Sequence, residues 1–260
     1  MRIALCQTTT VWEDINTNLV NSQKIVEELF EKSFKIDIIV FPEFFTTGFS
    51  VDNKSIAEDM NGPSVEWMRE MSKKYSAAFF ASIPIFQNGK YFNRAFFVSP
   101  ENEWYYNKRH LFSYGGENRL YSQGDKRVIV NYRGWRILLQ ICYDLRFPVW
   151  SRNVALEYDL IINVANWPSS RESVVSPLVR ARAVENLSYY AFVNRAGEDP
   201  NCQYNKIGFV SNFKGDKIPP VLVDDKNGIW TIYDLDLDSI RLFRETFRVW
   251  EDADKFSLYL

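Results

Sequence analysis

Residues 135–148 read Trp-Arg-Ile-Leu-Leu-Gln-Ile-Cys-Tyr-Asp-Leu-Arg-Phe-Pro, and the character of this stretch changes at Cys142. Residues 135–141 are mostly apolar and have the length of a strand, whereas a polar turn follows the cysteine. A short apolar run that ends in polar residues is typical of a buried strand. The sequence therefore predicts a strand that holds the thiol of Cys142 at its carboxyl end.

Two more reactive side chains occupy similar positions. Glu43 follows the mostly apolar residues 36–42, and Lys108 follows hydrophobic residues at 96–98 and 104–106. Pockets in α/β proteins commonly form where strands end at their carboxyl side. We therefore expect the thiol, the carboxylate and the ammonium group to share one pocket.

Strand-like and helix-like segments alternate along the chain. The strands are expected at 3–7, 37–41, 78–85, 94–98, 104–107, 128–132, 135–141, 160–164, 189–193, 208–212 and 229–233, and the helices at 18–34, 64–75, 172–187 and 239–247. This alternation indicates an α/β architecture. At 260 residues without an evident linker or repeat, the chain is expected to form one domain over residues 1–260 rather than two small ones. The apolar end at 256–260 is expected to dock on the core or on a partner subunit.

Composition limits the classes of function. The net charge is −2, and the basic residues are scattered, so binding to nucleic acid is not expected. No signal peptide and no run of about 20 apolar residues is evident, which predicts a cytoplasmic protein without a membrane association. The single histidine excludes a His-rich zinc centre, and the three cysteines fit reduced thiols, so we expect no metal.

The three reactive groups can support acyl transfer. A thiol becomes a strong nucleophile only when a base or a positive charge assists its deprotonation. Glu43 could accept that proton, and Lys108 could stabilise an oxyanion that forms on an attacked carbonyl. Each residue also has a structural interpretation: Cys142 as a small core side chain, Glu43 as a loop cap and Lys108 as a solvated surface group.

Three blocks of sequence, in this order, resemble the signature blocks of the nitrilase superfamily of carbon-nitrogen hydrolases. They are Phe-Pro-Glu at 41–43, Asn-Lys-Arg-His-Leu-Phe at 107–112 and Ile-Cys-Tyr-Asp-Leu-Arg-Phe-Pro at 141–148. The resemblance extends from the first strand to about residue 208. It implies a four-layer αββα sandwich that assembles as a homodimer or a higher homo-oligomer.

The resemblance also implies catalytic roles. Glu43 would be the general base, Lys108 would stabilise the tetrahedral intermediate, and Cys142 would be the acylated nucleophile. Glu117 matches a second glutamate of many members, which orients the lysine and the substrate. The backbone N–H of Tyr143 would be a second oxyanion donor. No cofactor is needed for this chemistry, and His110 receives no chemical role.

Two further blocks, at 163–168 and 180–186, are similar to the ω-amidase group. The resemblance implies that the substrate is a small amide, 2-oxoglutaramate or 2-oxosuccinamate, which water converts to a 2-oxo acid and ammonia. Such a substrate carries a carboxylate that needs a cation or N–H donors. Arg146 is the first candidate, although it could instead form a salt bridge that fixes its loop, and Arg171 and Arg195 remain possible. Candidate pocket walls are Phe44, Tyr114, Asn166 and Trp167.

Two alternatives remain open. The protein could hydrolyse another substrate, such as an N-carbamoyl compound or a nitrile. It could also be a binding module without turnover on the same fold. The joint presence of Glu43, Lys108, Glu117 and Cys142 argues against the second alternative, because a scaffold does not require these four groups together.

Overall fold

Short apolar segments form the strands of two large sheets and one two-stranded sheet in the computed structural model, which describes residues 1–32, 35–50, 53–224 and 226–257. The strands are β1 (Arg2–Cys6), β2 (Ile38–Val40), β3 (Ala78–Gln87), β4 (Lys90–Val98), β5 (Glu103–Asn107), β6 (Ile129–Tyr132), β7 (Trp135–Ile141), β8 (Leu160–Ala165), β9 (Tyr189–Asn194), β10 (Gly197–Glu198), β11 (Gln203–Tyr204), β12 (Gly208–Ser211), β13 (Leu222–Val223) and β14 (Trp230–Asp234). All strands expected from the sequence form, with small differences at their ends.

Three short strands were not expected. Strands β10, β11 and β13 contain two residues each, which is too few to show an alternating pattern. They form because their partners supply the register: β10 pairs with β11, and β13 pairs with the edge of β14.

The α-helices are α1 (Ile15–Glu31), α2 (Asn53–Ile56), α3 (Pro63–Tyr75), α4 (Pro148–Ser151), α5 (Val175–Glu185) and α6 (Leu237–Thr246). The 3₁₀ helices are η1 (Ser113–Gly115), η2 (Glu117–Arg119), η3 (Cys142–Arg146), η4 (Val154–Leu156), η5 (Ser169–Val174) and η6 (Val249–Asp252). Helix α1 begins three residues before the expected start because Asp14 caps it, accepting a hydrogen bond from the Thr17 N–H at 3.0 Å. The expected helix at 172–187 is divided into η5 and α5.

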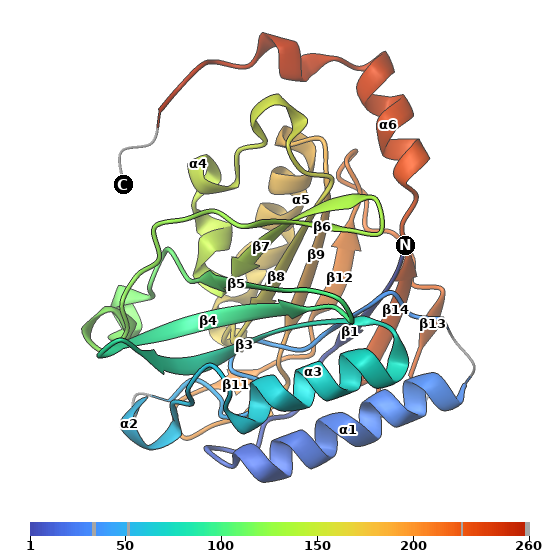
Figure 1. Ribbon diagram of the computed structural model, residues 1–260. Coiled ribbons are helices and arrows are strands. Elements are labelled where there is room, and N and C mark those ends of the chain that lie inside the picture. The colour runs from blue at the N-terminus through green and yellow to red at the C-terminus, as the bar shows by residue number, and fades with distance from the viewer. Residues whose placement is uncertain (33–34, 51–52, 225, 258–260) are drawn as a thin grey trace.

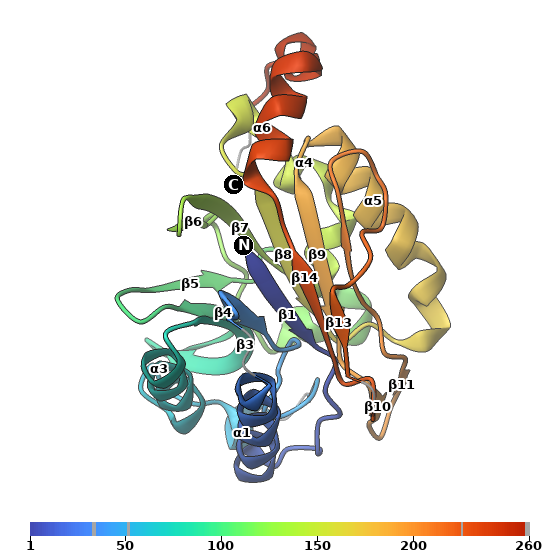
Figure 2. The ribbon, with the colours of Figure 1, turned by 90° about the vertical axis from the view of Figure 1, so that its right-hand side faces the viewer.

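The two large sheets lie face to face with helices outside them (Figures 1 and 2). One sheet has the order β13-β14-β1-β2-β3-β4-β5, and the other has the order β12-β9-β8-β7-β6. Helices α1 and α3 cover the outer face of the first sheet, and α5 covers the second (Figure 2). The expected four-layer αββα sandwich is therefore confirmed.

Two apolar cores match these layers. The larger core includes Leu5 and Phe80 of the first sheet together with Leu139 and Ile162 of the second. The other core joins the outer face of the first sheet to α1 and α3 through residues such as Val26 and Met68. Near the C-terminus, α6 buries Ile240 and Arg244. Of the apolar end expected to dock, residues 258–260 lie outside the described residues.

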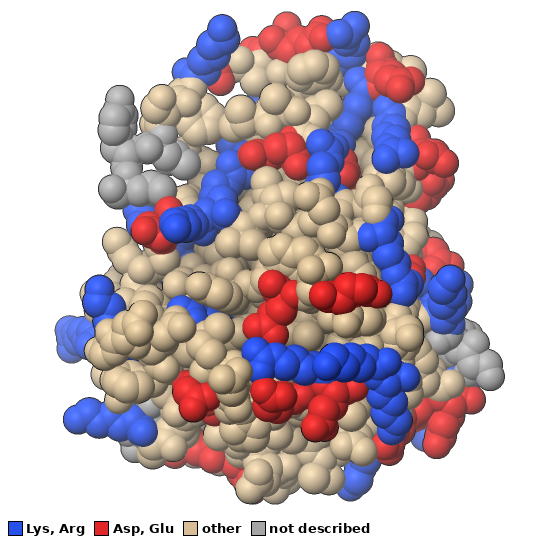
Figure 3. Space-filling model, in the orientation of Figure 1, with Lys and Arg blue, Asp and Glu red and all other residues tan. Residues whose placement is uncertain are grey.

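The surface carries mixed charge. On the face shown in Figure 3, Lys and Arg side chains alternate with Asp and Glu side chains, so this face has no extended field of one sign. Some opposite charges are paired directly, as in the contact of Arg69 with Glu103. None of the helices in the described part of the chain combines the length and the apolar character that crossing a membrane requires.

Candidate active site

Strand direction gathers the reactive side chains at one edge of the sandwich. Strand β2 runs parallel to β3, and the successive antiparallel pairs β3–β4 and β4–β5 bring β5 back to the same direction. Glu43 and Lys108 therefore follow strands that end on the same side of the first sheet. In the second sheet, β7 and β8 are also parallel, and Cys142 and Asn166 are the residues that directly follow them.

A sharp turn presents Cys142. The residue stands at the junction of β7 and η3 with a φ of 45°, in the left-handed region that a side chain with a Cβ seldom adopts. A non-glycine residue in this region costs about 1–3 kcal/mol. The carboxylate of Asp144 stabilises the turn, because its Oδ2 accepts a hydrogen bond from the Ile141 N–H at 3.0 Å. The turn directs the thiol away from the end of the strand and into the pocket.

Lys108 bridges two carboxylates in the interior. Its Nζ lies 2.8 Å from Oε1 of Glu43 and 2.9 Å from Oε2 of Glu117. The side chains of all three residues are inaccessible to solvent. Asn93 completes the cluster, since its Nδ2 donates to Glu43 at 2.7 Å and to Glu117 at 2.8 Å. Burial of two acids with one base is tolerated only because each charged group has hydrogen-bond partners.

The cluster shifts the protonation equilibria. Burial raises the pKa of the Cys142 thiol, the Glu43 carboxylate raises it further, and Lys108 only partly opposes them. Burial alone would lower the pKa of Lys108, but the carboxylates of Glu117 and Glu43 raise it above its ordinary value. Burial also raises the pKa of Glu117 against the opposing effect of Lys108. At neutral pH the resting site therefore holds a protonated thiol beside a charged lysine.

Asn166 connects the two sheets at the site. Its backbone N–H donates to Oε2 of Glu43 at 2.8 Å, and its side-chain Nδ2 donates to the carbonyl oxygen of Glu43 at 2.9 Å. The two oxygens of the Glu43 carboxylate thus have different surroundings, Lys108 and Asn93 on one side and the end of β8 on the other. This arrangement fixes the Glu43 carboxylate beside Cys142. The carboxylate also forms a hydrogen bond with the Cys142 thiol.

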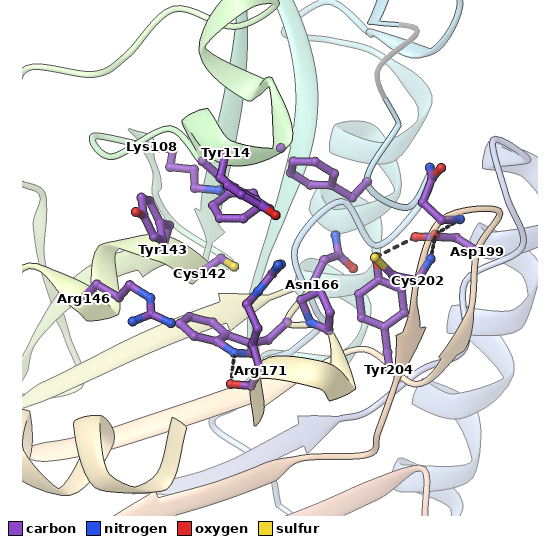
Figure 4. Close-up of a pocket in the computed structure, with 16 residues that line it drawn as sticks. Lys108, Tyr114, Cys142, Tyr143, Arg146, Asn166, Arg171, Asp199, Cys202 and Tyr204 are labelled. Carbon is purple, nitrogen blue, oxygen red and sulfur yellow. Dashed lines mark hydrogen bonds between the residues drawn. The ribbon is translucent and has the colours of Figure 1, made fainter. Parts of the chain in front are cut away.

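A pocket of about 820 Å³ opens above Cys142 and Lys108 (Figure 4). Aromatic side chains form much of its wall, and polar groups come from η3, η5 and the β10–β11 turn. The residues that line it are Phe49, Lys108, Phe112, Tyr114, Gly115, Cys142, Tyr143, Arg146, Asn166, Trp167, Pro168, Arg171, Asp199, Asn201, Cys202 and Tyr204. The size suits a small organic substrate.

Most of the residues expected near the pocket line it. Tyr143, Tyr114, Asn166 and Trp167 are in its wall, and Tyr114 is 87% exposed at the entrance. Phe44 differs from the expectation: it is fully buried, packs against Phe49 and Tyr121, and is not one of the lining residues. Its neighbour Phe49, whose ring centre is 5.9 Å from that of Phe44, lines the pocket instead.

The three candidate arginines have different surroundings. Arg146 is exposed, and its guanidinium lies 5.3 Å from the ring centre of Trp167. Arg171 lines the pocket with its guanidinium 4.8 Å from the ring centre of Phe112. Arg195 is fully buried, where it donates to the carbonyl oxygens of Thr10 and Glu198 and approaches Asp199, and it does not line the pocket.

Other residues of the site were not anticipated. Asn93 lies in β4, but the strand was expected to start at residue 94 and so did not include it. The signal in the sequence for its role at the site was a polar residue beside apolar strand positions. Asp144 also links several elements, because it accepts hydrogen bonds from the hydroxyl of Tyr106 and from His110. The contacts of Asp144 with Tyr106 and His110 join residues that are more than 30 positions apart, so sequence spacing does not reveal them.

Comparison with known proteins identifies the family. The family model described as carbon-nitrogen hydrolase matches residues 2–245. The chain is 38% identical to the omega-amidase YafV of Escherichia coli K12 over 263 residues, covering all of this chain and 99% of that protein. It is 30% identical to the 2-oxoglutaramate amidase of Bacillus subtilis over 187 residues, covering 70% of this chain and 72% of that protein.

A solved structure gives the same result. XC1258 from Xanthomonas campestris, described as a CN-hydrolase superfamily protein with an arsenic adduct in the active site, superimposes with a TM-score of 0.92 at 36% identity. The match covers all of this chain and 99% of that one. The resemblance drawn from the three sequence blocks is thereby confirmed, and the chain belongs to the carbon-nitrogen hydrolase family.

Proposed function

We propose that this protein is a cysteine-dependent amidase, which hydrolyses a small amide that also carries a carboxylate, through a thioester on Cys142. The observation that carries the proposal is the buried cluster of Glu43, Lys108 and Glu117 next to the thiol at the closed end of the pocket. A nucleophile, a proton carrier and an oxyanion stabiliser are what amide hydrolysis requires of a protein.

The acylation half of the reaction begins with a neutral thiol, because burial and Glu43 raise the pKa of Cys142. Glu43 removes the proton as the sulfur attacks the amide carbon. The negative charge that develops on the carbonyl oxygen is stabilised by the Lys108 ammonium and the backbone N–H of Tyr143. When the C–N bond breaks, Glu43 returns its proton to the nitrogen, and ammonia leaves.

The deacylation half uses the same groups. Glu43 removes a proton from a water molecule, whose oxygen attacks the thioester carbon. The C–S bond breaks, the sulfur recovers the proton, and the carboxylic acid is released. Glu117 does not exchange protons in this scheme. Its carboxylate lies 2.9 Å from the Lys108 Nζ. Burial lowers the pKa of Lys108, and the charge of Glu117 is the largest of the effects that raise it again and so keep the lysine charged.

The relatives support the choice of substrate. Two of them are named omega-amidase and 2-oxoglutaramate amidase, and the first aligns over the whole chain. The pocket suits an anionic amide, since the half-buried cation Arg171 is among its lining residues. We therefore propose 2-oxoglutaramate or 2-oxosuccinamate as the substrate, with water as the second reactant and a 2-oxo acid and ammonia as products.

The decisive experiment measures ammonia release from 2-oxoglutaramate, an N-carbamoyl amine and a nitrile, together with the mass of Cys142-containing peptides after rapid acid quenching. We expect ammonia from 2-oxoglutaramate, an acyl increment on Cys142 and no turnover by Cys142→Ala. Faster turnover of the carbamoyl compound or the nitrile would show that the substrate belongs to that class and is not 2-oxoglutaramate. Absence of turnover with every compound would favour the binding module.

The proposal extends to the organisation of the protein: one domain over residues 1–260, a homodimer or a higher homo-oligomer, and a cytoplasmic location. Exposed apolar side chains on α5 and α6, including Val184 and Leu242, are suited to contact with a second copy. Light scattering coupled to size-exclusion chromatography tests the assembly, and a monomeric mass at micromolar concentration would contradict it.

A further inference from the structure

We propose that Arg171 is the residue that binds the carboxylate of the substrate and so sets the preference for anionic amides. This inference rests on the function proposed above, because it assigns one group of the same pocket to one group of the substrate. Figure 4 shows the guanidinium of Arg171 pointing into the pocket toward Cys142, whereas Arg146 lies to one side.

The backbone of Arg171 is fixed while its charged group is available. The Arg171 N–H donates to the Pro168 carbonyl oxygen at 3.0 Å, and the Arg171 carbonyl oxygen accepts from the Trp167 indole N–H at 2.9 Å. The guanidinium stacks over Phe112. Within the described ranges it has no ion-pair or hydrogen-bond partner. A planar guanidinium offers paired N–H donors that match the two oxygens of a carboxylate.

The other cations of the site are less suitable. The ammonium of Lys108 already contacts Glu43 and Glu117. Arg195 is buried outside the pocket and donates to backbone carbonyl groups. Arg146 is exposed at the edge, where water competes for its charge. Arg171 is half-buried and lies within the pocket, so a carboxylate bound there loses less of the interaction to solvent.

The acid of the pocket does not compete for Arg171. Asp199 is the carboxylate among the lining residues, and its oxygens accept hydrogen bonds from the Tyr204 hydroxyl and from the backbone N–H groups of Asn201 and Cys202. It also lies 3.5 Å from Arg195. The Asp199 carboxylate thus already has hydrogen-bond partners and a counterion of its own, which leaves the charge of Arg171 available to a ligand.

The assignment explains how one pocket would select short amides with a distal carboxylate. Attack requires the amide carbon at Cys142 and its oxygen near Lys108, while the carboxylate reaches toward Arg171. A neutral amide would occupy the same site of attack without the second anchor. Loss of a charge-assisted hydrogen-bonded pair should reduce kcat/KM for the anionic substrate by about 10- to 100-fold.

The test compares succinamate with butyramide, in which a methyl group replaces the carboxylate. We expect Arg171→Gln to lower kcat/KM for succinamate by about 10- to 100-fold, chiefly through KM, and to change butyramide hydrolysis less than about twofold. Arg171→Lys should fall between the wild type and Arg171→Gln, because it keeps the charge without the planar pair of donors. Arg146→Gln should leave the ratio between the two substrates unchanged.

Succinate provides a second measurement that does not depend on turnover. Calorimetric titration of succinate into the Cys142→Ala variant should show binding. The affinity should be about 10- to 100-fold weaker in the double variant that also carries Arg171→Gln. Equal losses for succinamate and butyramide, unchanged succinate binding, or a selective loss in Arg146→Gln instead would overturn the assignment. If the wild type releases no ammonia from either amide or from 2-oxoglutaramate but binds succinate through Arg171, the proposed function fails, whereas Arg171 remains a carboxylate-binding residue of the pocket.

Discussion

The imidazole Nδ1 of His110 lies 2.8 Å from Oδ1 of Asp144, and this contact joins the segment after Lys108 to the turn that carries Cys142. The same oxygen accepts the backbone N–H of His110 at 3.1 Å, and the other carboxylate oxygen accepts the Tyr106 hydroxyl at 2.8 Å. The imidazole also stacks on Phe147, with ring centres 3.7 Å apart. The single histidine, which had no role from sequence, thus connects the segment after Lys108 to the turn at Cys142.

We predict that Asp144→Asn destabilises the protein and impairs turnover. An amide has one acceptor oxygen, so some of the donors now bonded to the carboxylate would face an N–H group or lose their partner. The cost should be about 1–3 kcal/mol of unfolding free energy. Urea unfolding measures the stability, and kcat measures the alignment of the turn. His110→Phe, which can keep the stack on Phe147, should cost less. Equal unfolding midpoints for Asp144→Asn and the wild type would contradict this role.

A second prediction concerns the thiol. Because burial and Glu43 raise the pKa of Cys142, its alkylation by iodoacetamide should still accelerate with pH above 9. Glu43→Gln removes a negative charge next to the sulfur, so the pH profile of alkylation should move to lower pH while amide turnover is lost. The measurement is the mass of the modified peptide in a Cys202→Ser background. A profile that moves upward, or does not move, would show that Glu43 does not act on the thiol through its charge.

Local patterns predicted the α/β class and placed Glu43, Lys108 and Cys142 after strands, whereas the four-layer αββα arrangement was implied by the resemblance of three sequence blocks to a known family. Apolar runs located the strands, and the three side chains were expected to share a pocket because each follows a strand. The sequence did not show that Cys142 follows a strand of a different sheet from Glu43 and Lys108. Phe44 shows the limit of such reasoning, since an aromatic residue next to a reactive one can equally belong to the core. The contacts of Asn93 and Asp144 depend on strands that are distant in sequence, and no spacing rule gives them. The choice between Arg146 and Arg171 depended on side-chain direction, which sequence does not specify.

The third prediction compares the members of the buried cluster. Lys108→Met leaves the carboxylates of Glu43 and Glu117 together without their cation, which should cost about 3–5 kcal/mol at pH 7. Loss of Lys108 also removes an interaction that lowers the pKa of Glu117, so its folded-state pKa rises further. A group with a raised folded-state pKa destabilises the fold above that pKa, and the penalty therefore decreases as the pH falls.

Urea unfolding of Lys108→Met at pH 7 and pH 5 should thus give a smaller difference from the wild type at the lower pH. Lys90→Met, at an exposed position at the start of β4, is the matched control and should change stability by less than about 0.5 kcal/mol. A penalty of the same size at both pH values would mean that lost packing, rather than unpaired carboxylates, explains the effect.

The last prediction concerns Asp159, which attaches α6 to the second sheet and lies outside the pocket. Its side chain is 3% exposed and accepts hydrogen bonds from Arg136 at 2.7 Å and from Arg244 of α6 at 2.6 Å. Burial alone would raise the pKa of Asp159, but the hydrogen bonds from the two arginines lower it below the ordinary value of 3.8. A lowered pKa stabilises the folded state above pH 3.8, and this contribution is lost as the pH falls through the folded-state value.

Asp159→Asn should therefore destabilise the protein by about 3 kcal/mol at pH 7, because the buried guanidinium of Arg244 loses its counterion. The difference from the wild type should shrink as the pH falls below 3.8, where the carboxylate of the unfolded wild type becomes protonated, and should vanish only below the lower folded-state pKa. Urea unfolding at pH 7, 5 and 3.5 measures this trend, and Asp238→Asn, whose side chain is 93% exposed, should change stability by less than about 1 kcal/mol. Since Asp159 is remote from Cys142, kcat of the folded variant should stay near the wild-type value. A pH-independent difference would show that the arginines act through packing alone.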